Sequence, residues 1–214
     1  MKTLNEIYNH VIKTQRTDKG RGFKNHLELY GDLFSSYREN ASKVFEIGVN
    51  RGGSISMWHE YFSNATIYGL DINPEAMERV KGERTVGILL DQSDKAQLGI
   101  FGLKHGPFDI GIDDGSHVWS HQILTFETLF PYIKPGGLFV CEDVLTSYPF
   151  WLQNSKSAKR IRYATGNIST IDYFKELVDK INFYGKEPSG ENTILHEIDW
   201  ISFRYNSVFI RKCK

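Results

Sequence analysis

The sequence has no excess of charge of either sign. Lysine and arginine together number 26, as do aspartate and glutamate, so the formal net charge is zero. Proteins that bind nucleic acids or membrane surfaces usually show a basic excess. The charge balance therefore gives no support to a nucleic acid or a membrane as partner.

Cysteine is scarce, and long apolar runs are absent. Only Cys141 and Cys213 occur, and their spacing indicates neither a disulfide framework nor a zinc site. No run approaches the roughly 20 apolar residues that cross a bilayer. The first residues, MKTLNEIYNHVIKTQ, lack the apolar centre of a signal peptide. We therefore expect a reduced, cytoplasmic protein.

Two helices are predicted before residue 40. Thr3 and Glu6 form a capping-box pair ahead of apolar residues at helical spacing. A second helical pattern covers 26–39. The length of 214 residues fits one large domain. We expect a helical segment at 1–40 and a main domain at 41–214, compact as a whole.

From residue 43 onward, short apolar runs alternate with helical patterns. The runs are KVFEIG (43–48), ATIYGLDI (65–72), TVGILLD (85–91), FDIGID (108–113) and GGLFVCED (136–143). This alternation predicts a parallel sheet with helices on both faces. Residues 197–205 and 207–212 follow each other too closely for a helix between them, so they predict a hairpin. We predict an α/β fold with a mostly parallel seven-stranded sheet that ends in an antiparallel hairpin.

A glycine-rich turn, FEIGVNRGGS (45–54), follows the first strand. Gly48 permits a sharp turn, and Gly52 and Gly53 allow a ligand to approach the backbone. Asp71 ends the second strand, where an acidic residue takes the ribose hydroxyls of an adenosine cofactor. A tight turn without a ligand is the alternative. The G-x-x-x-G-G spacing favours S-adenosylmethionine over NAD.

A second candidate contact with the cofactor is LLDQSD (89–94), at the end of the third strand. This stretch is placed to hold the adenine. With nearly equal weight, Ser93 or Asp94 is instead the N-cap of a following helix.

Two acidic pairs end strands. Asp113 and Asp114 follow the fourth strand, and Glu142 and Asp143 follow the fifth. Carboxylates brought together repel one another unless a cation or a proton intervenes. An all-oxygen set suits Mg²⁺, or Mn²⁺ and Ca²⁺, better than zinc. We favour a metal site over the alternative, in which Asp114 or Ser116 caps a helix over 117–130.

His117 is the candidate general base. It is expected in the first turn of that helix, and it faces away from the predicted apolar stripe of Trp119, Ile123, Phe126 and Phe130. A histidine near both a cofactor and a metal is suited to accept a proton.

The segment 144–167 mixes aromatic and basic residues. Tyr148 and Trp151 suit the face of a sugar ring, and Arg160 and Arg162 suit a diphosphate. A surface loop with solvated charges is an equal alternative.

Several stretches together resemble the macrocin and mycinamicin sugar O-methyltransferases, a metal-dependent class I family. They are TDKG, FEIGVNRGGSISMW, YGLDINP, LLDQSD, IDDGSHVWSHQ, LFPYIKPGGLFVCEDV and NSVFIRK. The resemblance implies magnesium ligands at Asp114, Glu142 and Asp143, and a catalytic base at His117. It also implies a set of cofactor contacts: Glu46, Gly48 and Ser54 at the methionine end, Asp71 at the ribose, Asp91 and Gln92 at the adenine, and Asp114.

The expected function is transfer of a methyl group from S-adenosylmethionine to a sugar hydroxyl, assisted by Mg²⁺ or Mn²⁺. The acceptor is a nucleotide-linked sugar or a glycoside of surface-polysaccharide or natural-product biosynthesis. Alternatives are an NAD-dependent oxidoreductase, an iron-dependent hydroxylase of the cephalosporin type and a non-enzymatic cofactor-binding subunit. A catechol is an alternative acceptor, and a homo-oligomer is an open alternative to a monomer.

Overall fold

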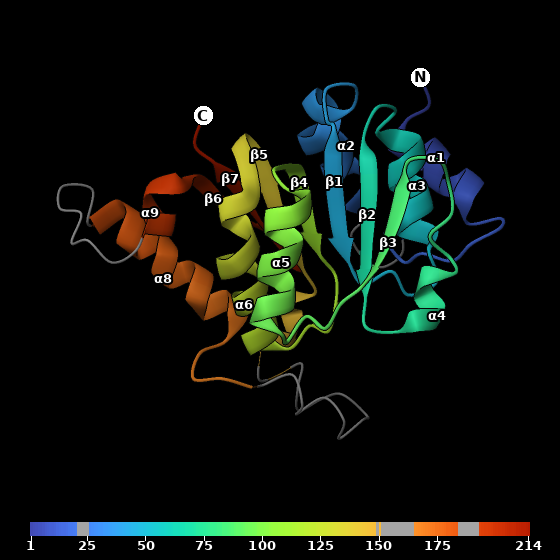
Figure 1. Ribbon diagram of the computed structural model, residues 1–214. Helices are drawn as coiled ribbons and strands as arrows, with labels where there is room; N and C mark the ends of the chain where they lie inside the picture. The colour runs from blue at the N-terminus through green and yellow to red at the C-terminus, as the bar shows by residue number, and fades with distance from the viewer. Residues whose placement is uncertain (21–25, 149, 151–164, 184–192) are drawn as a thin grey trace. The chain divides into compact units, whose positions relative to one another are not determined.

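The computed structural model describes residues 1–20, 26–148, 150, 165–183 and 193–214. The chain, drawn in Figure 1, divides into two compact units, Met1–Asp91 and Gln92–Lys214. Within the described ranges, no helix has the length and apolar character needed to cross a membrane. The predicted boundary between residues 1–40 and 41–214 stays a prediction.

The first unit contains three parallel strands, β1 (Lys43–Ile47), β2 (Thr66–Asp71) and β3 (Thr85–Leu89), in the order β3-β2-β1. All three were predicted from their apolar runs. The edge strand β3 is covered less completely than the strands inside the sheet, because Val86 is 36% exposed and Leu89 57% exposed. An apolar run therefore marked the strand without determining that both of its faces are buried.

The helices of the first unit are α1 (Leu4–Val11), α2 (His26–Phe34), α3 (Gly53–Tyr61) and the short α4 (Pro74–Met77). The predicted capping box at the start of α1 is present, since Thr3 and Glu6 each accept a hydrogen bond from the other's backbone N–H. The second helix is shorter than predicted and continues only as a 3-10 turn over Ser35–Tyr37. A cluster of buried aromatic rings joins α2 to α3 and its end: Tyr30, Phe34, Trp58 and Phe62.

The second unit contains four strands in the order β4-β5-β7-β6. They are β4 (Phe108–Asp113), β5 (Ile133–Glu142), β6 (Ile198–Arg204) and β7 (Ser207–Lys212). Strands β4 and β5 are parallel, whereas β7 is antiparallel to both β5 and β6. The predicted closing hairpin is therefore confirmed. Strand β5 begins at Ile133, three residues before the predicted start at 136.

The helices of the second unit are α5 (Lys95–His105), α6 (Trp119–Leu129), α8 (Thr170–Phe183) and α9 (Thr193–Glu197). Asp94 accepts hydrogen bonds from the backbone N–H groups of Ala96 and Gln97, so the predicted alternative of a helix cap at this position is confirmed. Figure 1 shows α8, in orange, next to α6, and the two helices are in contact.

The face that α6 buries differs from the predicted stripe. Its buried residues are Gln122, Thr125, Phe126 and Leu129. Trp119 and Ile123 are only half-buried. The prediction assigned the buried face to apolar residues alone, but two polar side chains lie on it. Their hydrogen bonds, described below, make that burial favourable.

Candidate active site

The acidic pairs of the second unit meet at one edge because β4 and β5 are parallel neighbours. Asp113 pairs in register with Cys141, so the residues that follow each strand emerge side by side. An oxygen of Asp114 lies within 4.8 Å of ligand atoms of His117 and Asp143, and within 4.8 Å of an oxygen of Glu142. The structure therefore brings all three predicted metal ligands and the predicted base together.

His117 does not belong to the helix that was predicted to begin there. Helix α6 begins at Trp119, its N-cap is Val118, and no side chain caps it. The backbone of His117 has a φ of 58°, a left-handed conformation that cannot continue a helix. The helix position and the capping alternative for Asp114 and Ser116 are both wrong. His117 instead lies in the turn between β4 and α6.

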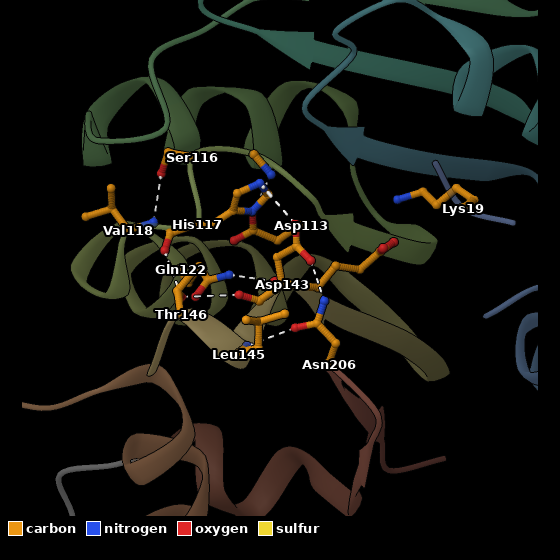
Figure 2. A network of polar contacts seen from close by, with 12 residues as sticks. Lys19, Asp113, Ser116, His117, Val118, Gln122, Asp143, Leu145, Thr146 and Asn206 are labelled. Atoms are coloured by element: carbon orange, nitrogen blue, oxygen red, sulfur yellow. Dashed lines mark hydrogen bonds and ion pairs between the residues drawn. The ribbon is translucent and has the colours of Figure 1, made fainter. Parts of the chain in front are cut away.

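The imidazole of His117 faces the carboxylate of Asp143. Its Nε2 atom lies 3.3 Å from Asp143 Oδ2, and both side chains are half-buried (Figure 2). Thr146 joins their backbones, because its Oγ1 lies 3.2 Å from the carbonyl oxygens of both residues. With Nε2 directed at the Asp143 carboxylate, Nδ1 is the ring nitrogen left to accept a proton.

Asp143 also has a left-handed backbone, with a φ of 55°. Asn206 donates its side-chain N–H to Asp143 Oδ1 and accepts a hydrogen bond of 2.9 Å from the Leu145 backbone N–H. Figure 2 shows these contacts beside the pair formed by His117 and Asp143. The two carboxylate oxygens of Asp143 are thus oriented toward different partners.

Asp113 is fully buried and has a role that the sequence did not reveal. Gln92 donates to both of its oxygens, at 2.7 and 2.8 Å, and the Gly115 N–H donates at 3.2 Å. Burial raises the pKa of Asp113 to about 7, although the Gly115 N–H, the charge of His117 and the Gln92 amide act in the opposite direction. Since successive side chains of a strand point to opposite faces, Asp113 points inward and Asp114 does not.

Gln92, the predicted adenine contact, has its side chain engaged inside the second unit. Besides Asp113, its Nε2 contacts Thr125 Oγ1 at 3.0 Å, and its Oε1 accepts the Ser116 N–H at 2.9 Å. Asp91, its neighbour, is half-buried at the end of the first unit. The contact of either residue with adenine stays a prediction.

Gln122 supports the other turn in a similar way. Its Nε2 donates to the carbonyl oxygen of Glu142 at 2.7 Å, and its Oε1 accepts from Thr170 Oγ1 at 2.7 Å. All three residues are buried. The polar residues on the buried face of α6 therefore connect the helix to the end of β5 and the start of α8.

In the first unit, the glycine turn and Asp71 lie together. Gly48 has a φ of 96° and Gly52 a φ of 78°, conformations that favour glycine. Asp71 accepts the backbone N–H of Asn50 at 3.0 Å and that of Asn73 at 2.9 Å. The predicted ribose contact is thus held at the carboxyl end of β2, beside the turn.

Glu46 and Ser54, the predicted contacts with the methionine end, are both buried. Glu46 accepts the indole N–H of Trp58 at 3.2 Å, and Lys19 Nζ lies 3.0 Å from its other oxygen. Strand β1 therefore carries a buried carboxylate, Glu46, that contacts Trp58 and Lys19.

The predicted substrate residues are mostly outside the described ranges. Tyr148 is described and is 49% exposed, as a ring available to a ligand would be. Trp151, Arg160 and Arg162 lie outside the described residues.

Comparisons with known proteins identify the family to which the chain belongs. A model described as a methyltransferase domain matches residues 45–144. The 8-demethyl-8-alpha-L-rhamnosyl tetracenomycin-C 2'-O-methyltransferase of Streptomyces olivaceus is 38% identical over 202 residues, 89% of this chain and 51% of the relative. The demethylmacrocin O-methyltransferase of Streptomyces fradiae is 36% identical over 160 residues, 71% of this chain and 38% of the relative.

Solved structures agree with the sequence comparisons. The MycE methyltransferase from the mycinamycin biosynthetic pathway, in complex with Mg and SAH, aligns with a TM-score of 0.82 and 30% identity over 100% of this chain and 54% of that chain. The chain is a relative of the macrocin and mycinamicin sugar O-methyltransferases. The predicted family and the Rossmann-like class I methyltransferase fold are confirmed. This chain spans about half the length of the relatives it matches.

Proposed function

We propose that this protein is an S-adenosylmethionine-dependent O-methyltransferase that acts on a sugar hydroxyl with the help of Mg²⁺. The observation that carries the proposal is the cluster at the ends of β4 and β5, where Asp114, His117 and Asp143 offer ligand atoms within 4.8 Å of one another. The named relatives support the choice of reaction, since one is an O-methyltransferase of a rhamnosyl tetracenomycin and the other a demethylmacrocin O-methyltransferase.

The residues present fit a divalent cation. Asp114, Glu142 and Asp143 supply carboxylate oxygens, the donors that Mg²⁺ prefers, with Mn²⁺ as an alternative. When bound, the cation supplies a Lewis acid that lowers the pKa of a coordinated sugar hydroxyl. Asp113 is not part of this set, because its carboxylate is fully buried and points inward to the Gln92 amide.

His117 is proposed as the base that accepts the hydroxyl proton. A neutral imidazole does so with one ring nitrogen, and Asp143 Oδ2, 3.3 Å from Nε2, stabilises the imidazolium that forms. His117 lies in a turn and not in a helix, since its backbone is left-handed. The contact of its Nε2 with Asp143 orients the imidazole before the substrate arrives.

The cofactor contacts are proposed from both the resemblance and the first unit. S-adenosylmethionine supplies the methyl group, and the turn at Gly48 and Ser54 leaves backbone accessible to it. Asp71 is already fixed by two backbone N–H groups, and each of its oxygens retains a further acceptor position for a ribose hydroxyl. Glu46 is proposed to bind the methionine amino group.

The acceptor is proposed to be a sugar with two adjacent hydroxyls, in a glycoside or a nucleotide-linked sugar. Tyr148 is proposed to contact the sugar ring, and Trp151, Arg160 and Arg162 to contact the ring or a diphosphate. A surface polysaccharide is a further acceptor of the same chemistry. A cytoplasmic location and a homo-oligomeric state stay predictions.

The deciding experiment is a calorimetric titration of S-adenosylhomocysteine, followed by assays of methyl transfer to rhamnosides, nucleotide-linked rhamnose and a catechol. We expect binding of S-adenosylhomocysteine and metal-dependent methylation of one of the sugars. Binding of NAD instead, or hydroxylation with iron, would replace the proposal by one of the alternatives. Methylation of the catechol alone would correct the acceptor class.

A further inference from the structure

The two turns that supply the proposed metal ligands have unusual backbones. His117 and Asp143 both have φ values near +60°, a region that residues other than glycine rarely adopt. Such conformations persist only where surrounding contacts determine them. Besides Thr146, two side-chain amides from distant parts of the second unit contact residues of these two turns.

Gln92 holds the turn after β4. It is 6% exposed, donates to both oxygens of Asp113, and accepts the N–H of Ser116. Asp114 lies between these two anchored residues. A third contact, with Thr125 on α6, fixes the amide itself. The position of Asp114 therefore depends on a residue that precedes it by more than twenty positions.

Asn206 holds the turn after β5. It belongs to the two-residue turn between β6 and β7, where its own φ is 57°. Its side-chain amide donates to Asp143 Oδ1 and accepts from the Leu145 N–H. Its backbone carbonyl oxygen accepts from the Val144 N–H at 3.3 Å. Oδ1 is thereby held on the side of the hairpin, and Oδ2 faces His117.

We propose that Gln92 and Asn206 are positioning residues that hold Asp114 and Asp143 in the arrangement that binds the metal. This rests on the proposed function, since it concerns the same metal. Residues that orient metal ligands by hydrogen bonds change metal affinity by about 10- to 100-fold when they are replaced. Neither residue contacts the metal or the substrate in this role.

Two variants separate positioning from folding. Gln92→Met keeps a side chain of similar length and removes every hydrogen bond of the amide. Asn206→Gly keeps the hairpin turn, because glycine accepts a positive φ, and removes only the side chain. Matched controls are Gln97→Met and Asn182→Ala, whose exposed amides donate to Asp94 and to the Val178 carbonyl oxygen, away from the two turns.

The measurement is the binding of Mn²⁺, followed by the loss of the electron paramagnetic resonance signal of the free ion. We expect the wild type and both controls to bind alike, and the two variants to bind about 10- to 100-fold more weakly. Thermal melting without metal reports folding. Raising the Mn²⁺ concentration should restore methyl transfer by Asn206→Gly, which a damaged fold would not allow.

The outcomes are distinguishable. A wild type that takes up no Mn²⁺ overturns the proposed metal-assisted function. A wild type that binds Mn²⁺ while both variants bind equally well overturns the positioning role alone. If Gln92→Met does not fold, Asn206→Gly decides the question, because its turn is compatible with glycine.

Discussion

Lys19 and Glu46 form an ion pair in the interior of the first unit. Lys19 Nζ lies 3.0 Å from Glu46 Oε1, and the two side chains are 1% and 0% exposed. The segment that contains Lys19 packs closely on α3, since a Cβ atom at Gly53 would lie 2.4 Å from the carbonyl oxygen of Arg16. The pair thus fastens this segment to the strand that precedes the glycine turn.

We predict that Lys19→Met destabilises the protein by about 3–5 kcal/mol, because it leaves the Glu46 charge buried without its cation. Chemical denaturation measures the change. Lys2→Met is the control: Lys2 pairs with Glu60 at 2.6 Å but is 56% exposed, so its loss should cost about 0–1 kcal/mol. Equal effects of the two substitutions would show that burial of the Lys19 pair contributes nothing.

We predict that His117→Ala lowers the rate of methyl transfer by about 10²–10⁴-fold, the usual contribution of a general base. The affinity for S-adenosylhomocysteine should be unchanged, as calorimetry can show. His10→Ala is a suitable control, because His10 is exposed and contacts Glu60. Normal turnover by His117→Ala would remove this residue from the mechanism.

We predict that EDTA abolishes methyl transfer and that added Mg²⁺ or Mn²⁺ restores it. Asp114→Asn and Asp143→Asn should weaken metal affinity, since each replaces a charged ligand by a neutral one. A titration of activity against metal concentration measures both effects. Full activity after exhaustive chelation would exclude a catalytic metal.

We predict a contribution of His59 to the pH dependence of stability. Burial lowers the pKa of His59 from its usual 6.5, and the Arg84 cation acts in the same direction. As the pH falls, His59 therefore binds its proton near pH 6.5 in the unfolded chain and only at a lower pH in the folded chain. The free energy of unfolding should fall as the pH drops below about 6.5.

Denaturation curves of the wild type and His59→Gln at several pH values test this. The difference between the two proteins should be constant above about pH 6.5 and should change below it. A difference that is constant over the whole range would show that His59 titrates alike in both states.

Much of the fold could be predicted because burial leaves a pattern along the chain. Strands covered on both faces appear as apolar runs, and the Thr3–Glu6 capping box marks a helix start. The acidic pairs could be placed together because neighbouring parallel strands bring their carboxyl ends to one edge, as the Asp113–Cys141 register does.

The errors have a common physical origin. His117 was assigned to a helix because its sequence neighbours are compatible with one. In the structure it lies in a left-handed turn, where Thr146 and Asp143 contact it. The buried face of α6 was missed because periodicity detects apolar residues, whereas Gln122 and Thr125 are buried through hydrogen bonds to distant groups.

The sequence by itself determined the class of fold, the family, and the acids and histidine of the candidate site. These depend on residue type, local spacing and strand-end position. Only the tertiary structure decided which groups orient the acidic side chains. Lys19 contacts Glu46, Gln92 contacts Asp113 and Asn206 contacts Asp143. Those partners are far apart in the chain, and their contacts exist only because the packing of strands and helices brings them within hydrogen-bonding distance.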